Sequence, residues 1–293
     1  MAPPVVRARF ADSESVFKPD IFKGKVLFCT GGGSGICKGM TYAMMKHGAN
    51  AAIAGRKLDR LTQAAEELSK GTGNTCIPTQ ADVRKPDQLK DAVRKTIEKF
   101  GRIDFVICGA AGNFLAPLSG LSENAFRTVM EIDTLGTFNT FKATIPYLRE
   151  SHGSYIHVGV AFHRRGLPYQ AHVSAAKAAI DSLSRVIAVE EGPWGVRSNV
   201  IAPGPISNTE GMSRLRVSGD EGAFESFIPL GREGVIQDIA NATVFLFSDA
   251  ASLITGEALV VDGGLQQLST SSVPYPEAVL DPESARKLFK GKL

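Results

Sequence analysis

Residues 26–36 read VLFCTGGGSGI, an apolar run that ends in Thr30 and is followed by a cluster of glycines. An amphipathic run extends from Lys38 to His47, so the expected order is strand, tight turn, helix. Glycines let the backbone turn sharply and let phosphate oxygens approach its N–H groups, and the helix adds the positive end of its dipole. At the start of a βαβ unit, this pattern indicates a nucleotide-binding loop rather than an ordinary surface turn. The loop residues expected to bind the nucleotide are Gly31, Gly33, Ser34, Gly35 and Ile36.

Apolar and amphipathic runs alternate along the rest of the chain. The expected strands are 25–30, 50–54, 75–80, 104–108, 154–158, 196–201 and 258–261. The expected helices are 34–48, 58–69, 86–100, 124–148, 171–191 and 237–247. The strands are nearly all apolar, as in a sheet that helices cover on both faces. The alternation predicts an α/β fold with a Rossmann-type, doubly wound parallel sheet and right-handed crossovers.

The whole chain, 1–293, is interpreted as a single domain, because no internal repeat or low-complexity linker interrupts it. Residues 1–23 form a lead-in, and 266–293 form a C-terminal extension with a helix expected at 282–289. The polar, glycine-containing segment 205–232 breaks the alternation. It is interpreted as a lid over a site, with an ordinary surface insertion as the alternative.

The composition is that of a soluble globular protein, with 43% hydrophobic and 22% charged residues. A net charge of +3 argues against nucleic acid as a partner, and no apolar run is long enough to span a membrane. No secretory signal opens the chain, and no CxxC pair occurs. The cysteines are expected to be buried, reduced thiols in a reducing compartment: Cys29, Cys37, Cys76 and Cys108. The tripeptide Gly291-Lys292-Leu293 is similar to the peroxisomal signal Ser-Lys-Leu, with chance as the alternative.

The second strand ends in Ala54-Gly55-Arg56-Lys57, with Arg60 nearby. An acid at the end of this strand would bind the adenine ribose 2′-OH and favour NAD, but the position carries cations instead. Because a 2′-phosphate is anionic and suits a guanidinium, the cofactor is predicted to be NADP(H). The alternative is a solvated helix start. Asp82, after the third strand, is placed to reach the adenine amino group or to cap the next helix.

Several motifs together resemble the short-chain dehydrogenase/reductase superfamily. They are TGGGSGI at 30–36, Asp82-Val83, AAG at 110–112, SAAKAAID around Lys177, APGPI at 202–206 and VDGG at 261–264. The resemblance runs from about residue 24 to residue 265 and implies a Rossmann fold, a nicotinamide cofactor and a dimer or tetramer. Cys37 stands where the family's loop has its third glycine, a residue that serves close packing of helix on strand.

The chain departs from this superfamily at the catalytic positions. Val173 stands where the family has its tyrosine, and the stretch 157–161 offers no counterpart of the family's serine. Asp133 stands where the family has an asparagine in the long helix. Alcohol–ketone chemistry requires a hydroxyl acid/base beside Lys177, and this chain lacks it. The protein is therefore either catalytically inactive or the catalyst of a different reaction.

Four stretches resemble the peroxisomal 2,4-dienoyl-CoA reductases: 110–126, 130–140, 172–181 and 202–211. This resemblance implies NADPH-dependent reduction of 2,4-dienoyl-CoA to 3-enoyl-CoA in the β-oxidation of unsaturated fatty acids. In that group the tyrosine is also missing and an aspartate delivers the proton, which implies this role for Asp133. Lys177 would hold the nicotinamide ribose and place positive charge near the developing oxyanion. A purely structural hydrogen-bonding role is the alternative for Asp133.

The resemblance also implies the remaining contacts. The cofactor would meet Arg56, Lys57, Arg60, Asp82, Val83, Lys177, Pro203, Gly204, Ile206, Ser207 and Thr209. The acyl-CoA would meet Arg56, Arg84, Phe114, Ser122, Glu123, Asn124 and Arg214. The alternative for the arginines is that they are ordinary surface charges. The alternative for Phe114 is a place in the core. Asp181 and Asp262 are further acids of the group, interpreted as structural.

Two other functions stay open from the sequence. One is a ketone reductase whose acid has moved to Tyr169 or His172, although His172 is expected to be packed rather than catalytic. The other is a catalytically silent NADP(H)-binding sensor or scaffold. A homo-oligomer is expected, because in this superfamily the long helices that begin near 124 and 171 pack across subunits.

Overall fold

The computed structural model describes residues 10–209, 212, 225–268, 275 and 277–281. One sheet of seven parallel strands has the order β3-β2-β1-β4-β5-β6-β7. The strands are β1 (Val26–Thr30), β2 (Asn50–Gly55), β3 (Cys76–Gln80), β4 (Phe105–Cys108), β5 (Ser154–Val158), β6 (Arg197–Pro203) and β7 (Ala258–Val261). The order reverses direction between β1 and β4, so the crevice for a ligand lies at the carboxyl ends of these two strands.

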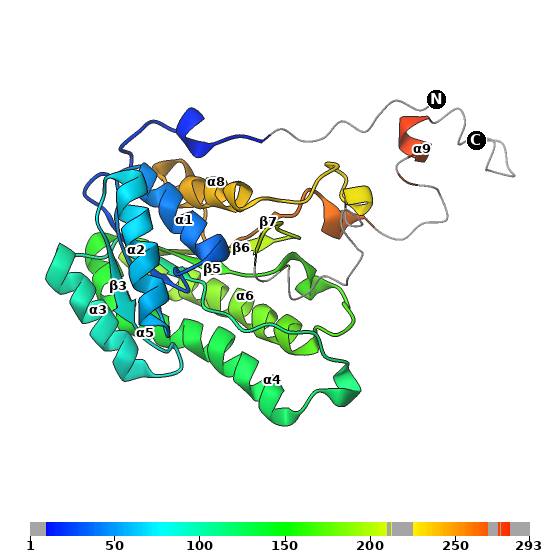
Figure 1. Ribbon diagram of the computed structural model, residues 1–293, viewed down its shortest axis with the longest axis horizontal. Helices are drawn as coiled ribbons and strands as arrows, with labels where there is room; N and C mark the ends of the chain where they lie inside the picture. The colour runs from blue at the N-terminus through cyan, green and yellow to red at the C-terminus, as the bar shows by residue number, and fades with distance from the viewer. Residues whose placement is uncertain (1–9, 210–211, 213–224, 269–274, 276, 282–293) are drawn as a thin grey trace, which may run out of the picture.

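Helices cover both faces of the sheet, as Figure 1 shows with α1 and α8 above it and α5 and α6 below. The first layer is α1 (Gly35–Lys46), α2 (Leu58–Thr72) and α8 (Ile236–Phe247). The second is α3 (Pro86–Phe100), α5 (Gly136–Ser151) and α6 (Ala171–Glu191), with α4 (Glu123–Met130) leading into α5. A short α9 (Glu277–Leu280) follows. The predicted doubly wound Rossmann-type fold is confirmed. The bounds of each predicted strand lie within two residues of the observed bounds.

Two helices of the first half of the chain end at residues in the left-handed conformation. Both α2 and α3 stop at glycines, Gly73 with φ +76° and Gly101 with φ +78°, which adopt this conformation without a Cβ penalty. The predicted helix 282–289 and half of the proposed lid, 210–211 and 213–224, lie outside the described residues.

The predicted continuous helix 124–148 differs from the structure. After α4, residues Glu131–Leu135 form one π-helical turn, and α5 begins at Gly136. Gly136 is required here, because a Cβ at this position would lie 2.6 Å from Cγ2 of Val83. Single π turns inside α-helices often mark functional sites, and this one carries Asp133.

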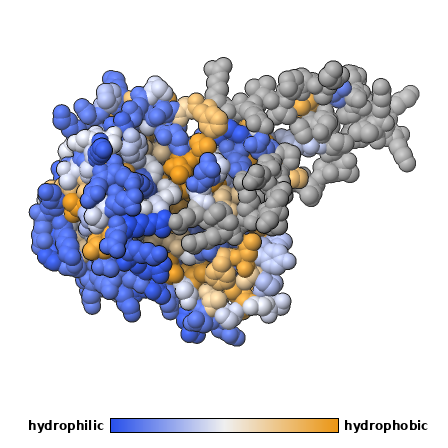
Figure 2. Space-filling view, viewed as in Figure 1, coloured by the Kyte–Doolittle hydropathy of each residue, from blue (hydrophilic) through white to orange (hydrophobic). Residues whose placement is uncertain are grey.

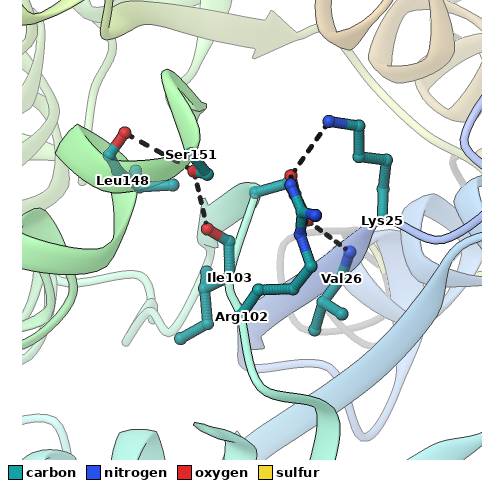
Figure 3. Close-up of polar contacts among 7 residues, drawn as sticks. Lys25, Val26, Arg102, Ile103, Leu148 and Ser151 are labelled. Atoms are coloured by element: carbon teal, nitrogen blue, oxygen red, sulfur yellow. Dashed lines mark hydrogen bonds and ion pairs between the residues drawn. The ribbon is translucent and has the colours of Figure 1, made fainter.

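A buried acid, Asp104, ties the amino ends of β1 and β4 together at the edge opposite the crevice. Its carboxylate accepts hydrogen bonds from Lys25 Nζ at 3.1 Å, from Val26 N at 2.9 Å and from Arg102 Nε at 2.8 Å. Figure 3 shows these donors converging, with Ser151 of α5 beside them. This cluster fixes the amino ends of β1 and β4, the two strands whose carboxyl ends frame the crevice.

Candidate active site

Asp133 lies fully buried at the centre of the π turn. Its Oδ1 accepts a hydrogen bond of 2.8 Å from Gly112 N, in the loop after β4. Its Oδ2 lies 3.1 Å from Lys177 Nζ but accepts no hydrogen bond of good geometry from the described residues. The π turn therefore aims the carboxyl group inward, with one oxygen fixed by Gly112 and the other facing Lys177.

Lys177 projects from the middle of α6 and is also buried. Besides its ion pair with Asp133, its Nζ donates to the carbonyl oxygen of Val158 at 2.9 Å. Buried ion pairs are tolerated when further hydrogen bonds satisfy the charged groups, as Val158 and Gly112 do here. The structure thus brings together the two predicted catalytic residues at the carboxyl end of β5.

Val173 fills the position of the superfamily's tyrosine with an apolar side chain. It is buried and packs in a small cluster with Val129 and Ala176. No hydroxyl is available at this position, so the departure seen in the sequence is also present in the structure.

The two alternative acids are poorly placed for that role. Tyr169 has a left-handed φ of +65° and leaves about half of its side chain exposed. His172 is fully buried, its ring stacks on Phe114 at 4.3 Å, and its Nε2 lies 3.1 Å from the Phe114 carbonyl oxygen. Burial lowers the pKa of His172, so the imidazole is neutral and its one proton is engaged with that carbonyl. The expectation that His172 is packed agrees with this geometry.

The glycine loop has the shape that a dinucleotide phosphate requires. Gly31 has φ +76°, and a Cβ there would lie 2.8 Å from the Gly109 carbonyl oxygen. Ser34 is the N-cap of α1 but makes no side-chain capping bond, and Gly35 follows with φ +56°. The first N–H groups of α1 are thus left for an anion, and the loop fits a nicotinamide dinucleotide.

Cys37 is accommodated by a second glycine. Its Sγ lies against Gly109, where an added Cβ would stand 2.2 Å from the sulfur. The space needed by the cysteine is therefore matched by the missing side chain across from it. The thiols Cys29, Cys37, Cys76 and Cys108 are all buried and free, as predicted.

The predicted cations of the β2–α2 turn are exposed. Arg56, Lys57 and Arg60 all face solvent, and the Arg56 carbonyl oxygen is held by Gln80 Nε2 at 2.9 Å. Lys57 is the N-cap of α2, and Asp59 follows in the first turn of that helix. The turn is fixed through its backbone, while the charged groups of its side chains remain accessible to a ligand.

Asp82 and Arg84 form a pair beside this turn. Arg84 Nε donates to Asp82 Oδ1 at 3.0 Å and a terminal nitrogen donates to Oδ2 at 2.6 Å. These hydrogen bonds lower the pKa of Asp82. The N-cap of α3 is Lys85, so the alternative role of Asp82 as a cap is wrong. Val83, between them, is buried and packs against Gly136.

The segment after β6 approaches the sheet closely. A Cβ on Gly204 would lie 2.6 Å from Cβ of Asp262, so Gly204 must pass this residue without a side chain. Ile206 is buried, Ser207 Oγ donates to Gly234 O at 3.2 Å, and Thr209 Oγ1 donates to Ile206 O at 2.9 Å. The carboxylate of Asp262 accepts from the backbone of Gly264 and Gln266, in line with its structural interpretation.

The predicted acyl-CoA residues lie on the loop from β4 to α4. Phe114 is 37% exposed, so its alternative place in the core is wrong. Ser122 caps α4 by accepting from Ala125 N at 3.2 Å, and Glu123 and Asn124 are exposed. A cavity of about 380 Å³ lies here, lined by Leu118, Leu121, Ser122, Glu123, Phe126 and Arg127. Figure 2 shows hydrophobic residues gathered near α4, and Arg214 lies outside the described residues.

Sequence reasoning missed the partners that orient the site. The backbone groups of Gly112 and Val158, which hold Asp133 and Lys177, have no side-chain signature. The buried amides of Asn113 and Gln170 were also missed, although both are polar residues that flank predicted site residues. Within the described residues, no group of His, Cys, Asp and Glu could hold a metal ion, and no helix is long and apolar enough to cross a membrane.

Comparison with known proteins gives consistent results. A family model described as Enoyl-(Acyl carrier protein) reductase matches residues 31–266. The peroxisomal 2,4-dienoyl-CoA reductase [(3E)-enoyl-CoA-producing] of Saccharomyces cerevisiae is 49% identical, over 92% of this chain and 94% of that protein. The Danio rerio protein of the same name is 45% identical, over 92% and 91%. A short chain dehydrogenase from Bacillus anthracis superposes with a TM-score of 0.76 at 36% identity, covering 85% of this chain and 99% of that one.

Proposed function

Because the chain belongs to the short-chain dehydrogenase/reductase superfamily and, within it, to the peroxisomal 2,4-dienoyl-CoA reductases, we propose that it reduces 2,4-dienoyl-CoA to 3-enoyl-CoA with NADPH. The observation that carries the proposal is the buried Asp133–Lys177 pair beside Val173. Val173 leaves no hydroxyl acid at the position where a ketone reductase needs one, and the carboxyl and ammonium groups are the titratable groups buried beside it. This arrangement suits protonation of carbon rather than of an alkoxide.

The glycine loop at 31–35 would hold the nicotinamide cofactor, which would supply a hydride for C5 of the diene. Negative charge then moves through the conjugated system to the thioester oxygen, where the charge of Lys177 stabilises it. Asp133, held by Gly112 and facing inward, gives its proton to the α-carbon, which leaves the double bond between C3 and C4. Asp133 regains its proton from solvent, so one proton is consumed in each cycle.

A ketone reductase with a relocated acid has less support. Tyr169 is half exposed, and the single proton of neutral His172 is engaged with a backbone carbonyl. A silent NADP(H)-binding protein would need neither a buried carboxyl group nor its lysine partner. The assay with a dienoyl-CoA distinguishes such a silent protein from an active reductase.

The test is an assay in which the loss of absorbance of NADPH and of 2,4-hexadienoyl-CoA is recorded. The product is expected to be 3-hexenoyl-CoA. The matched control is 2-hexenoyl-CoA, which lacks the second double bond and is expected to remain unreduced. Equal reduction of both substrates would indicate an enoyl reductase instead. Tight NADPH binding without any turnover would overturn the proposal in favour of the silent protein.

The coenzyme is proposed to be NADPH because Arg56 and Lys57 leave exposed cations where the adenine ribose is expected. In the double variant Arg56→Ala/Lys57→Ala, we expect the NADPH-over-NADH ratio of kcat/KM to fall by at least about 10-fold, since a single charge-assisted hydrogen bond is worth about 1.5–3 kcal/mol. The NADH value should change little. Arg94→Ala, on the exposed face of α3, is the control and should leave the ratio unchanged. Equal use of both coenzymes by the unmodified protein would contradict the proposal.

The acyl-CoA is proposed to bind along the loop from β4 to α4, with its phosphates near Arg56 and the Asp82–Arg84 pair. A homo-oligomer is proposed through the helices that follow this loop. Exposed apolar side chains on them support this: Leu135 in the π turn, Phe138 in α5, and Val186 and Val189 in α6. Sedimentation of the purified protein tests the proposal, and a monomer at micromolar concentration would oppose it.

The peroxisome is the proposed location, because the similar proteins carry that word in their names. The tripeptide Gly291-Lys292-Leu293, outside the described residues, is proposed as the import signal. A fluorescent protein fused in front of the chain should reach peroxisomes, and deleting the tripeptide from that fusion should leave it in the cytosol. Unchanged import after the deletion would remove the signal from the proposal.

A further inference from the structure

Two free thiols flank the glycine loop that is expected to hold the cofactor. Cys29 lies in β1, and Cys37 lies in the first turn of α1. The residues between them, 30–36, are the loop itself. The proposed reaction uses neither thiol. A covalent link between them would therefore act on the cofactor loop and leave the catalytic pair untouched.

The two thiols meet on the same face of the sheet. Both belong to one buried cluster, together with Met40 of α1. Cys29 Sγ lies 3.9 Å from the Cys37 carbonyl oxygen, and the two thiol groups share a hydrogen bond. A disulfide requires side chains that face each other at close range. Because these thiols are already in contact, a link between them needs a rearrangement of the loop ends rather than of the fold.

Cys37 is the more reactive thiol of the two. The hydrogen bond with Cys29 and the charge of Lys177 lower the pKa of Cys37 against the effect of burial, and the N-terminus of α1 also favours a thiolate. Burial raises the pKa of Cys29, so this thiol stays protonated. Cys37 is 6% exposed, whereas Cys29 is fully buried. An oxidant would therefore react with Cys37 first, and Cys29 would react with the product.

The other two cysteines lack this arrangement. Cys108 lies in β4 and packs in the cluster on the opposite face of the sheet. Burial raises its pKa, although the thiol is within electrostatic reach of Cys37. Cys76 lies in β3, and burial raises its pKa to about 12. Cys108 is therefore the natural control for the partner of Cys37.

We propose that Cys29 and Cys37 form an oxidation site for hydrogen peroxide, and that their disulfide prevents NADPH from binding to the loop. The Cys37 thiolate attacks the O–O bond and becomes a sulfenic acid, and the released hydroxide takes a proton to form water. The Cys29 thiol then attacks this sulfur, and its proton leaves with the hydroxyl group as a second water. The two thiols lose two electrons, and the peroxide gains them.

The position of Cys37 explains why the link would act on the cofactor. Its Sγ lies against Gly109 and donates to the Gly109 carbonyl oxygen at 3.7 Å. Turning the sulfur toward Cys29 breaks this contact and shifts the first turn of α1, whose N–H groups are free for an anion. A dinucleotide on the loop would in turn keep the two thiols apart. The inference rests on the cofactor-binding part of the proposed function.

The test treats the full chain with hydrogen peroxide, alkylates the remaining thiols and digests the protein with trypsin. Both cysteines fall on one expected peptide, 26–38, which should become about 2 Da lighter, the mass of the two hydrogens lost. The affinity for NADPH, measured by its fluorescence, should fall at least about 10-fold and recover after dithiothreitol, since phosphate contacts are lost. NADPH present during the treatment should prevent the link.

Two variants identify the partner of Cys37. Cys29→Ala should bind NADPH normally and form no link. Peroxide should instead leave it with a Cys37 sulfenic acid that dimedone traps, because no thiol resolves it. Cys108→Ala should form the link as the unmodified protein does.

Three results would overturn the inference. One is a peptide 26–38 that keeps its mass or carries only a sulfinic acid after treatment. Another is a link that is lost in Cys108→Ala and kept in Cys29→Ala. The third is unchanged NADPH affinity in the fully linked protein. If the untreated protein binds no NADPH, the proposed coenzyme is wrong, and the mass of the peptide still decides whether the oxidation site exists.

Discussion

Replacing Asp133 by asparagine is expected to lower the kcat for 2,4-dienoyl-CoA by about 100-fold or more, while NADPH still binds. The amide has the shape of the carboxyl group, and its oxygen can still accept the hydrogen bond that Gly112 N now gives to Oδ1. It has no proton to give to carbon near neutral pH. The loss is therefore expected in the chemical step rather than in binding, and it falls in the range measured for a general acid.

The measurement is single-turnover reduction of 2,4-hexadienoyl-CoA together with the dissociation constant of NADPH. Asp104→Asn is the matched control, because Asp104 is equally buried and ion-paired but lies at the opposite edge of the sheet. It should lower the melting temperature and leave kcat per folded molecule unchanged. Full activity in Asp133→Asn would assign Asp133 the structural role that the sequence left open.

The sequence predicted the fold because its signals are local or periodic. A strand such as Val26–Thr30 is buried on both faces and reads as an unbroken apolar run. Helix α3 begins at Pro86, ends before Gly101 and repeats its apolar residues at helical spacing, so its observed bounds equal the predicted ones. Strand boundaries moved by one or two residues, as in β6, where the ladder extends past the apolar run to Pro203.

The π turn could not be predicted in this way. Residues 124–148 keep an acceptable helical period throughout, and the extra residue in the turn at Glu131–Leu135 is set by distant contacts. Asp133 is bound by Gly112 from the β4 loop and by Lys177 from α6, while Gly136 lets the helix approach Val83. Each of these partners lies more than 20 residues away in the chain or on another element, so no local pattern records them.

The pair Asp82–Arg84 shows a signal that was available and missed. Arg84 N donates to Asp82 Oδ1 at 3.0 Å, a turn that an aspartate commonly makes with the N–H two residues later. This local preference would have argued against Asp82 as the cap of α3. The buried acceptor atoms of Asn113, Gln170 and His172 are different, because only the folded chain shows that they are buried and lack a hydrogen-bond donor among the described residues.

Replacing Lys177 by methionine is expected to have the largest combined effect of any single change in the site. Methionine keeps the length of the stem but leaves the buried Asp133 carboxylate without its cation, 3.1 Å away in the structure. Breaking a buried pair from one side costs about 3–5 kcal/mol, because the remaining charge stays desolvated. The charge that stabilises the thioester oxyanion is lost as well, so kcat should fall about 100–1000-fold.

A double-mutant cycle separates these two consequences. In Lys177→Met/Asp133→Asn, neither side chain is charged, so the double variant should unfold at a higher denaturant concentration than Lys177→Met alone. The kcat of the double variant should equal that of the less active single variant, since the proton source and the cation are both absent. A double variant no more stable than Lys177→Met would show that the two charges are not coupled in the folded protein. The carboxyl group would then be held mainly by Gly112, and its position in the π turn would not depend on the lysine.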